Sequence, residues 1–147
     1  MGQYSFSSIG DAIYNKMLEV KNTDVRVWSV FNHDIKIEWW ISLPAIIITP
    51  TNGNEIILDS CSMESNISFI VRLIDRIQDG IDQAEQNMRE VADLMMSRLK
   101  ELGTITWTTD NGATVKLEFS FQRGYADTQE PIRVFEVECN FMAIEQW

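Results

Sequence analysis

Histidine, cysteine and long apolar runs are scarce in this 147-residue sequence, and each scarcity excludes a class of protein. His33 is the only histidine, which removes most acid–base triads and most metal sites, because both commonly depend on imidazole groups. Cys61 and Cys139 stand far apart and outside CxxC spacing, so we expect neither a disulfide framework nor a zinc site. None of the seven glycines falls in the spacing of a phosphate-binding loop. We therefore predict no catalytic residue, no cofactor and no metal ion.

Basic residues are also few. Lysines and arginines number 12 against 22 aspartates and glutamates, which gives a formal net charge of −10. A protein that grips nucleic acid through its phosphates needs clustered basic residues, so this balance argues against that function. Two interpretations of the acidity remain open. It keeps the protein soluble, or it lines a surface past which another polyanion moves without adhering.

We expect neither a secretory signal nor a membrane span. The N-terminal segment lacks the basic start and apolar run of a secretory signal, and no apolar stretch reaches the roughly 18 residues of a membrane span. We expect a reducing cytoplasm, or a particle assembled there. The length suits one domain with a core of its own, so residues 1–147 are treated as a single domain.

Apolar periodicity predicts two helices. The first covers Ser8–Val20, with Ser8 and Asp11 in the spacing of a helix N-cap. The second covers Gly80–Leu102, and Gly103 is placed to end it. Its apolar stripe is long enough to pack on a sheet. The stripe consists of Ile81, Ala84, Met88, Val91, Ala92, Met95, Leu99 and Leu102.

Alternating or continuous apolar runs predict strands at 25–31, 35–41, 45–49, 55–59 and 67–77. Thr51-Asn52-Gly53-Asn54 predicts a turn between two of them. After the long helix, Asp110-Asn111-Gly112 predicts a hairpin with a return strand through 121. The segment 122–131 is expected to be an exposed loop. A final strand places Phe135, Val137, Cys139 and Phe141 inward.

The helices and strands do not alternate regularly along the chain. This order favours an α+β fold over a doubly wound one. We predict a mostly antiparallel, mixed sheet with two helices packed on one face and a closing β-hairpin at the C-terminus.

Carboxylates and tryptophans mark candidate surfaces. Glu118, Glu136 and Glu138 lie on the polar sides of two strands, so they share a face turned away from the helices if those strands pair. Such a set is either ordinary solvated surface or the wall of a channel. Trp39 and Trp40 must point to opposite faces of a shared strand, which leaves one outside the core and marks a candidate contact site. Of the four tryptophans on strand patterns, Trp28, Trp39, Trp40 and Trp107, most are expected in the core.

Two arginines and a tyrosine complete the candidate interface. Arg72 and Arg76 share a mixed strand face with apolar residues, which we expect to be partly buried against another chain. Tyr125 lies in the segment expected to be an exposed loop.

Three segments follow one another in a familiar order: a proline-led apolar strand at 43–50 (LPAIIITP), an alternating strand with an internal arginine at 67–72 (ISFIVR), and a helix at 84–91 (AEQNMREV). This order resembles the tail-terminator proteins of long-tailed bacteriophages, over roughly residues 7 to 144. The segments at 32–40 (NHDIKIEWW) and 122–131 (QRGYADTQEP) are long for that family, so contacts made there are not carried over.

The resemblance implies a virion structural protein, not an enzyme. It would form a hexameric ring on the last ring of the tail-tube protein, stop tube growth and bind the head-connector protein. DNA would pass through the lumen without specific binding, and no membrane would be involved. The protein would be assembled in the host cytoplasm and reside at the head–tail junction of the virion. Glu118, Glu136 and Glu138 are then candidate lumen-facing residues.

Other functions remain open beside this one. Another head–tail joining protein or a tail-tube protein would have a related fold. A small-molecule-binding α+β module and an enzyme that uses clustered carboxylates are alternatives from different classes, because one fold hosts many functions.

Overall fold

A computed structural model of the chain describes residues 2–3, 5–33, 43–76, 81–108, 114–115, 117–126 and 132–146. Several predictions fall outside these residues. They are the strand at 35–41 with Trp39 and Trp40, the hairpin turn at 110–112, and the end of the segment 122–131.

Helix α1 spans Phe6–Thr23 and begins earlier than predicted. Its N-cap is Ser5, whose Oγ accepts a hydrogen bond from the backbone N–H of Ser8 at 3.1 Å. The prediction that Ser8 caps the helix was therefore wrong, because Ser5 meets the free N–H groups of an earlier turn. The added turn includes Phe6, whose ring lies 5.0 Å from that of Phe69, centroid to centroid.

Five strands form the main sheet, in the order β2-β3-β4-β8-β7. Only β2 and β3 are parallel, and the other neighbours are antiparallel, which confirms the predicted mixed sheet. β3 and β4 form one long hairpin, and β7 and β8 form another. The strands are β2 (Ser29–Phe31), β3 (Ala45–Asp59), β4 (Ser62–Arg76), β7 (Leu117–Ala126) and β8 (Ile132–Gln146).

β3 passes straight through the predicted turn at Thr51–Asn54. Its pairing with β4 shifts by one residue between Pro50 and Asn52 and shifts again between Ile57 and Asp59, near the hairpin end. A bulge of this kind suits Pro50, which has no N–H to donate to the ladder. Gly53 lies close to the Phe6 ring, and a Cβ at this position would lie 2.7 Å from it, so a larger residue would require the ring to shift. The turn prediction was wrong because the continuous partner strand holds the segment extended.

The C-terminal strands divide between two sheets. β1 (Gly2–Gln3), β5 (Trp107–Thr108) and β6 (Thr114–Val115) form a small three-stranded sheet in the order β1-β5-β6. β5 and β6 are antiparallel, as the predicted hairpin requires. The predicted return strand is split, because Val115 and Leu117 belong to different sheets. The expected loop at 122–131 was wrong in its first half, where Gln122–Ala126 continues β7 along β8.

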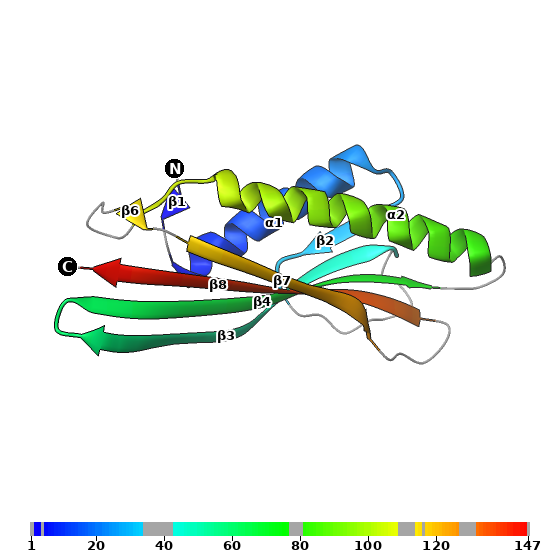
Figure 1. The fold of residues 1–147 in the computed structure, drawn as a ribbon. Coiled ribbons are helices and arrows are strands. Elements are labelled where there is room, and N and C mark those ends of the chain that lie inside the picture. Colours follow the sequence, from blue (N-terminus) through cyan, green and yellow to red (C-terminus); the bar gives the residue numbers. More distant parts are fainter. Residues whose placement is uncertain are drawn as a thin grey trace.

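Helix α2 spans Ile81–Lys100 and is followed by a 3-10 turn, η1, at Glu101–Thr104. Met88, Val91, Ala92, Met95, Leu99 and Leu102 of the predicted stripe are all buried. Both helices lie on the same face of the main sheet (Figure 1). Neither is long and apolar enough to cross a membrane, as far as the described residues show.

The main core lies between the helices and the sheet. It joins buried residues of α1, such as Ile13 and Met17, to the α2 stripe and to alternate residues of β3, β4 and β8. Cys139 belongs to this core, and burial raises the pKa of its thiol to about 12. A smaller apolar cluster, formed by Ile47, Ile74 and Val134 with partly buried neighbours, is separate from the main core.

Candidate functional site

The register of β7 and β8 places the three predicted carboxylates on one face of the sheet. Phe135, Val137 and Cys139 point into the core, so Glu136 and Glu138, which alternate with them, face away from the helices. Glu138 is opposite Gln122, and Glu118 is opposite Met142 on the same face. Met142 lies four positions beyond Glu138 on β8, which separates Glu118 from Glu138 by about 13 Å along the strand. The three side chains are thus spread along the face.

Two polar pairs cross this open face. Arg72 Nε donates to Glu136 Oε1 at 2.9 Å, and Ser68 Oγ donates to Asn140 Oδ1 at 2.7 Å. The charge of Glu136 is therefore balanced by Arg72, a candidate interface residue. Glu118 and Glu138 are exposed. No described side chain balances the charge of these two carboxylates, so their charge faces solvent.

The other candidate interface residues are not gathered at one place. Arg76 ends β4, where its backbone N–H donates to Asp75 Oδ1 at 2.8 Å. Tyr125 stands opposite Phe135 in the β7–β8 ladder. Trp39 and Trp40 lie outside the described residues.

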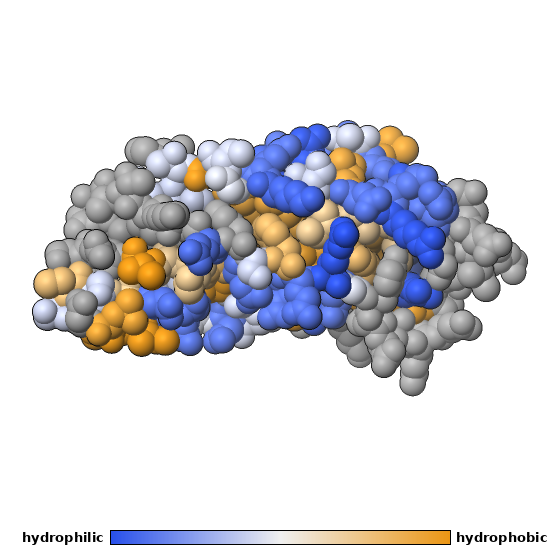
Figure 2. Space-filling model, in the orientation of Figure 1, coloured by the Kyte–Doolittle hydropathy of each residue, from blue (hydrophilic) through white to orange (hydrophobic). Residues whose placement is uncertain are grey.

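The far end of the β3–β4 hairpin exposes a group of apolar side chains. Exposure reaches 47% for Ile56, 73% for Ile57 and 51% for Leu58. Ile144 of β8 is 48% exposed and lies level with Ile56, on the other side of β4. This end of the hairpin extends beyond the helices (Figure 1), and hydrophobic residues gather there in the space-filling view (Figure 2). We call these four residues the apolar end. Isolated exposed apolar residues are common, but a contiguous group is typical of a contact surface.

β3 is also an edge strand over much of its length. β2 pairs with it only at Ala45–Ile47, and within the described chain no strand pairs with the outer side of β3 after that point. β7 is the other edge of the sheet. Unpaired backbone N–H and C=O groups along such edges are templates for pairing with another chain.

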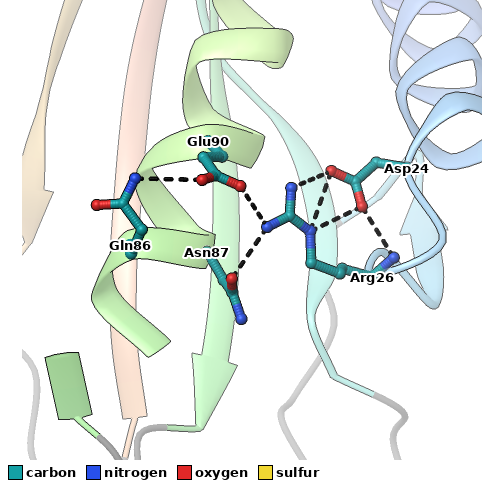
Figure 3. A network of polar contacts seen from close by, with 5 residues as sticks. All are labelled: Asp24, Arg26, Gln86, Asn87 and Glu90. Atoms are coloured by element: carbon teal, nitrogen blue, oxygen red, sulfur yellow. Dashed lines mark hydrogen bonds and ion pairs between the residues drawn. The ribbon is translucent and has the colours of Figure 1, made fainter. Parts of the chain in front are cut away.

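A polar network joins the α1–β2 connection to α2 (Figure 3). Arg26 is its centre. Its Nη2 lies 2.6 Å from Asp24 Oδ2, and its Nη1 lies 2.7 Å from Glu90 Oε2 and 3.0 Å from Asn87 Oδ1. Gln86 Nε2 donates to the other Glu90 oxygen at 3.1 Å. The guanidinium is thus fixed by two carboxylates from different elements.

Charges in this network shift one another. Hydrogen bonds from Arg26 lower the pKa of the Asp24 carboxyl below its usual value, and they do the same for the pKa of Glu90. Both carboxylates therefore stay ionised at neutral pH. The positive charge of Arg26 is fully offset within its own network.

A pocket of about 210 Å³ opens beside this network. Its wall is mostly apolar, and Asp75 supplies a carboxylate. Burial raises the pKa of Asp75, more than the neighbouring N–H and charge of Arg76 lower it. The lining residues are Arg26, Trp28, Pro44, Leu73, Asp75, Asn87, Met88 and Val91.

Trp28 and Asp75 were not identified from the sequence. Most tryptophans on strand patterns were expected in the core, but Trp28 is 64% exposed. β2 begins only at Ser29, and the backbone N–H of Trp28 donates to the Pro44 carbonyl. Trp107 is buried, as expected. The sequence does contain a signal for Asp75. This residue continues the alternation of Phe69, Val71 and Leu73, which places its carboxylate on the core-facing side of β4.

Comparisons with known proteins do not place the chain in a family. No protein-family model matches it, and no curated protein matches its sequence. Among the described residues, no group of histidine, cysteine, aspartate and glutamate side chains could hold a metal ion.

Proposed function

We propose that this protein is a ring-forming structural component of a phage tail that acts as a tail terminator. It caps the tail tube, stops its polymerisation and joins it to the head connector. The resemblance of three sequence segments to that family suggests the function, and the two-layer fold agrees with the order of elements on which the resemblance rests.

The observation that carries the proposal is the apolar end of the β3–β4 hairpin together with the open outer side of β3. An edge strand with exposed isoleucines is a liability for a free monomer, because it invites pairing with another chain. In a ring, the same surface is covered by the next subunit. Contacts between two different surfaces of identical chains close into a ring when the rotation between them allows it.

The open face of the sheet is consistent with a lumen. Glu118 and Glu138 are exposed on it, and the whole chain carries a net charge of −10. Burying unpaired carboxylates in a dry subunit contact is costly, so a water-filled channel suits them better. A negative wall repels passing DNA and prevents it from adhering.

Native mass spectrometry tests ring formation, alone and in the presence of the tail-tube protein. We expect a six-fold ring, and Ile57→Lys should prevent it while the unfolding temperature stays nearly unchanged. Val25→Lys is the matched control, because Val25 is apolar and 88% exposed but lies away from the apolar end. A monomer under all conditions, or a ring that Ile57→Lys leaves intact, would contradict the role of this surface.

Tube growth tests the terminator function itself. Added to polymerising tail-tube protein, the wild-type ring should bind tube ends and shorten the tubes. Tubes of unchanged length with no protein at their ends would contradict the proposal, even if the ring forms.

A further inference from the structure

The pocket beside the Arg26 network has the size and composition of a side-chain receptor. Pockets for drug-sized ligands measure about 300–1,000 Å³, and this one measures about 210 Å³. Its apolar walls come from Pro44, Leu73, Met88 and Val91. Trp28 lines it as well and is exposed to solvent, and exposed aromatic residues beside a small pocket are typical of sites that anchor a partner's side chain.

The charge around the pocket is negative. Among the described residues that line it, Arg26 is the only basic one, and it forms ion pairs with Asp24 and Glu90. Counting Asp75, and Arg76 whose charge acts on it, three carboxylates lie in or beside the pocket with two guanidinium groups. Arg133 stands opposite Asp75 in the β4–β8 register but does not line the pocket. An additional cation would balance this charge, whereas an additional anion would be repelled.

Asp75 is positioned to bind that cation. Its carboxylate accepts a hydrogen bond from the backbone N–H of Arg76, whose charge also acts on it, and within the described chain it forms no direct ion pair. Because Asp75 is partly buried, its ionised form is disfavoured, and a bound cation would offset this cost. A carboxylate that is kept in such a position at a cost to stability is typical of a functional site.

We propose that this pocket binds the side chain of a lysine from a partner protein. The ammonium group lies against Asp75, and the aliphatic stem packs on Met88 and on Trp28, whose ring also attracts the cation. The partner presents the lysine on a surface that complements the acidic chain. This inference does not depend on ring formation or on a role in a phage tail.

The pocket carries its own reporter, because Met88 lines it. Methyl-labelled methionine gives sharp NMR signals in a monomer or a large ring, and Met88→Leu identifies the signal. The probes are three capped pentapeptides of alanine with a central lysine, norleucine or glutamate. The lysine peptide should shift the Met88 signal with the highest affinity, the norleucine peptide several-fold more weakly, and the glutamate peptide not at all. Added salt should weaken binding of the lysine peptide only.

Two variants separate the pocket from general acidity. Asp75→Asn keeps the shape of the side chain and should reduce the affinity for the lysine peptide several-fold, to the level of the norleucine peptide. Asp93→Asn, at an exposed position of α2 outside the lining, should leave that affinity unchanged. Equal loss in both variants would show nonspecific attraction and overturn the proposal.

Free butylamine distinguishes a partner's side chain from a small amine. We expect it to bind several-fold more weakly than the lysine peptide, because the peptide adds backbone contacts around Trp28. Equal or tighter binding of butylamine would make this a small-amine site and overturn the assignment to a partner protein. No shift of the Met88 signal with any probe at millimolar concentration would overturn the site itself.

Discussion

Arg72 and Glu136 form an ion pair across β4 and β8, with Nε and Oε1 2.9 Å apart on the face of the sheet turned away from the helices. Their side chains are about one-third exposed, 29% and 35%. The pair divides the three predicted lumen carboxylates into one that is balanced and two, Glu118 and Glu138, that are exposed. The charge facing a channel would therefore come mainly from those two.

Charge reversal at these two positions tests the lumen assignment. Glu118→Lys combined with Glu138→Lys should leave the fold and the ring intact but slow DNA ejection from assembled particles, because the wall then attracts phosphates. The matched control reverses two exposed carboxylates on the helices, Asp11→Lys with Asp93→Lys, and should eject DNA normally. Normal ejection by the first variant, in fully assembled particles, would leave Glu118 and Glu138 as ordinary solvated surface.

Leu99 tests the packing of α2 on the sheet. Its side chain is fully buried in the main core, so Leu99→Ala should lower the free energy of unfolding by about 2–5 kcal/mol. Ser97→Ala, at an exposed position of the same helix, should change it by less than about 0.5 kcal/mol. Urea unfolding followed by circular dichroism measures both. An unchanged midpoint for Leu99→Ala would show that the stripe does not pack on the sheet.

Asp24 links stability to pH through Arg26. Because folding lowers the pKa of Asp24, its ion pair stabilises the protein above the usual pKa of the carboxyl, and this contribution is lost as the pH falls through the lowered value. Asp24→Asn should cost about 1 kcal/mol at neutral pH. The wild type and the variant should converge on acidification. A difference in thermal stability that persists at the acid end would contradict this linkage.

Asp75 should have the opposite effect on how stability depends on pH. Folding raises the pKa of Asp75, so the ionised carboxylate destabilises the fold at a pH above both the folded-state and the unfolded-state pKa. This cost disappears as the pH falls through the raised pKa of the folded state toward the usual pKa of the unfolded state. Asp75→Asn should therefore raise the unfolding temperature at neutral pH, with the gain shrinking in acid. Asp93→Asn serves as the exposed control. A lower unfolding temperature for Asp75→Asn at neutral pH would show that the ionised carboxylate contributes favourably to the fold.

The sequence by itself determined the class of the fold and the faces of its longest elements. The period of the α2 stripe and the alternation of Phe135, Val137, Cys139 and Phe141 are strong local signals, and the structure buries every member of both sets whose side chain is described. The side of the sheet on which Glu118, Glu136 and Glu138 lie followed from the same alternation. These features depend only on periodicity within one element, which a sequence displays directly.

Only the tertiary structure decided where the elements end and which side chains meet. Thr51–Asn54 is extended because β4 runs beside it without a break, a partner that no local pattern reveals. Trp28, Asp75 and Met88 line one pocket although they come from three distant segments. Contacts of this kind depend on the packing of one layer on another, so they arise only when the whole chain is folded.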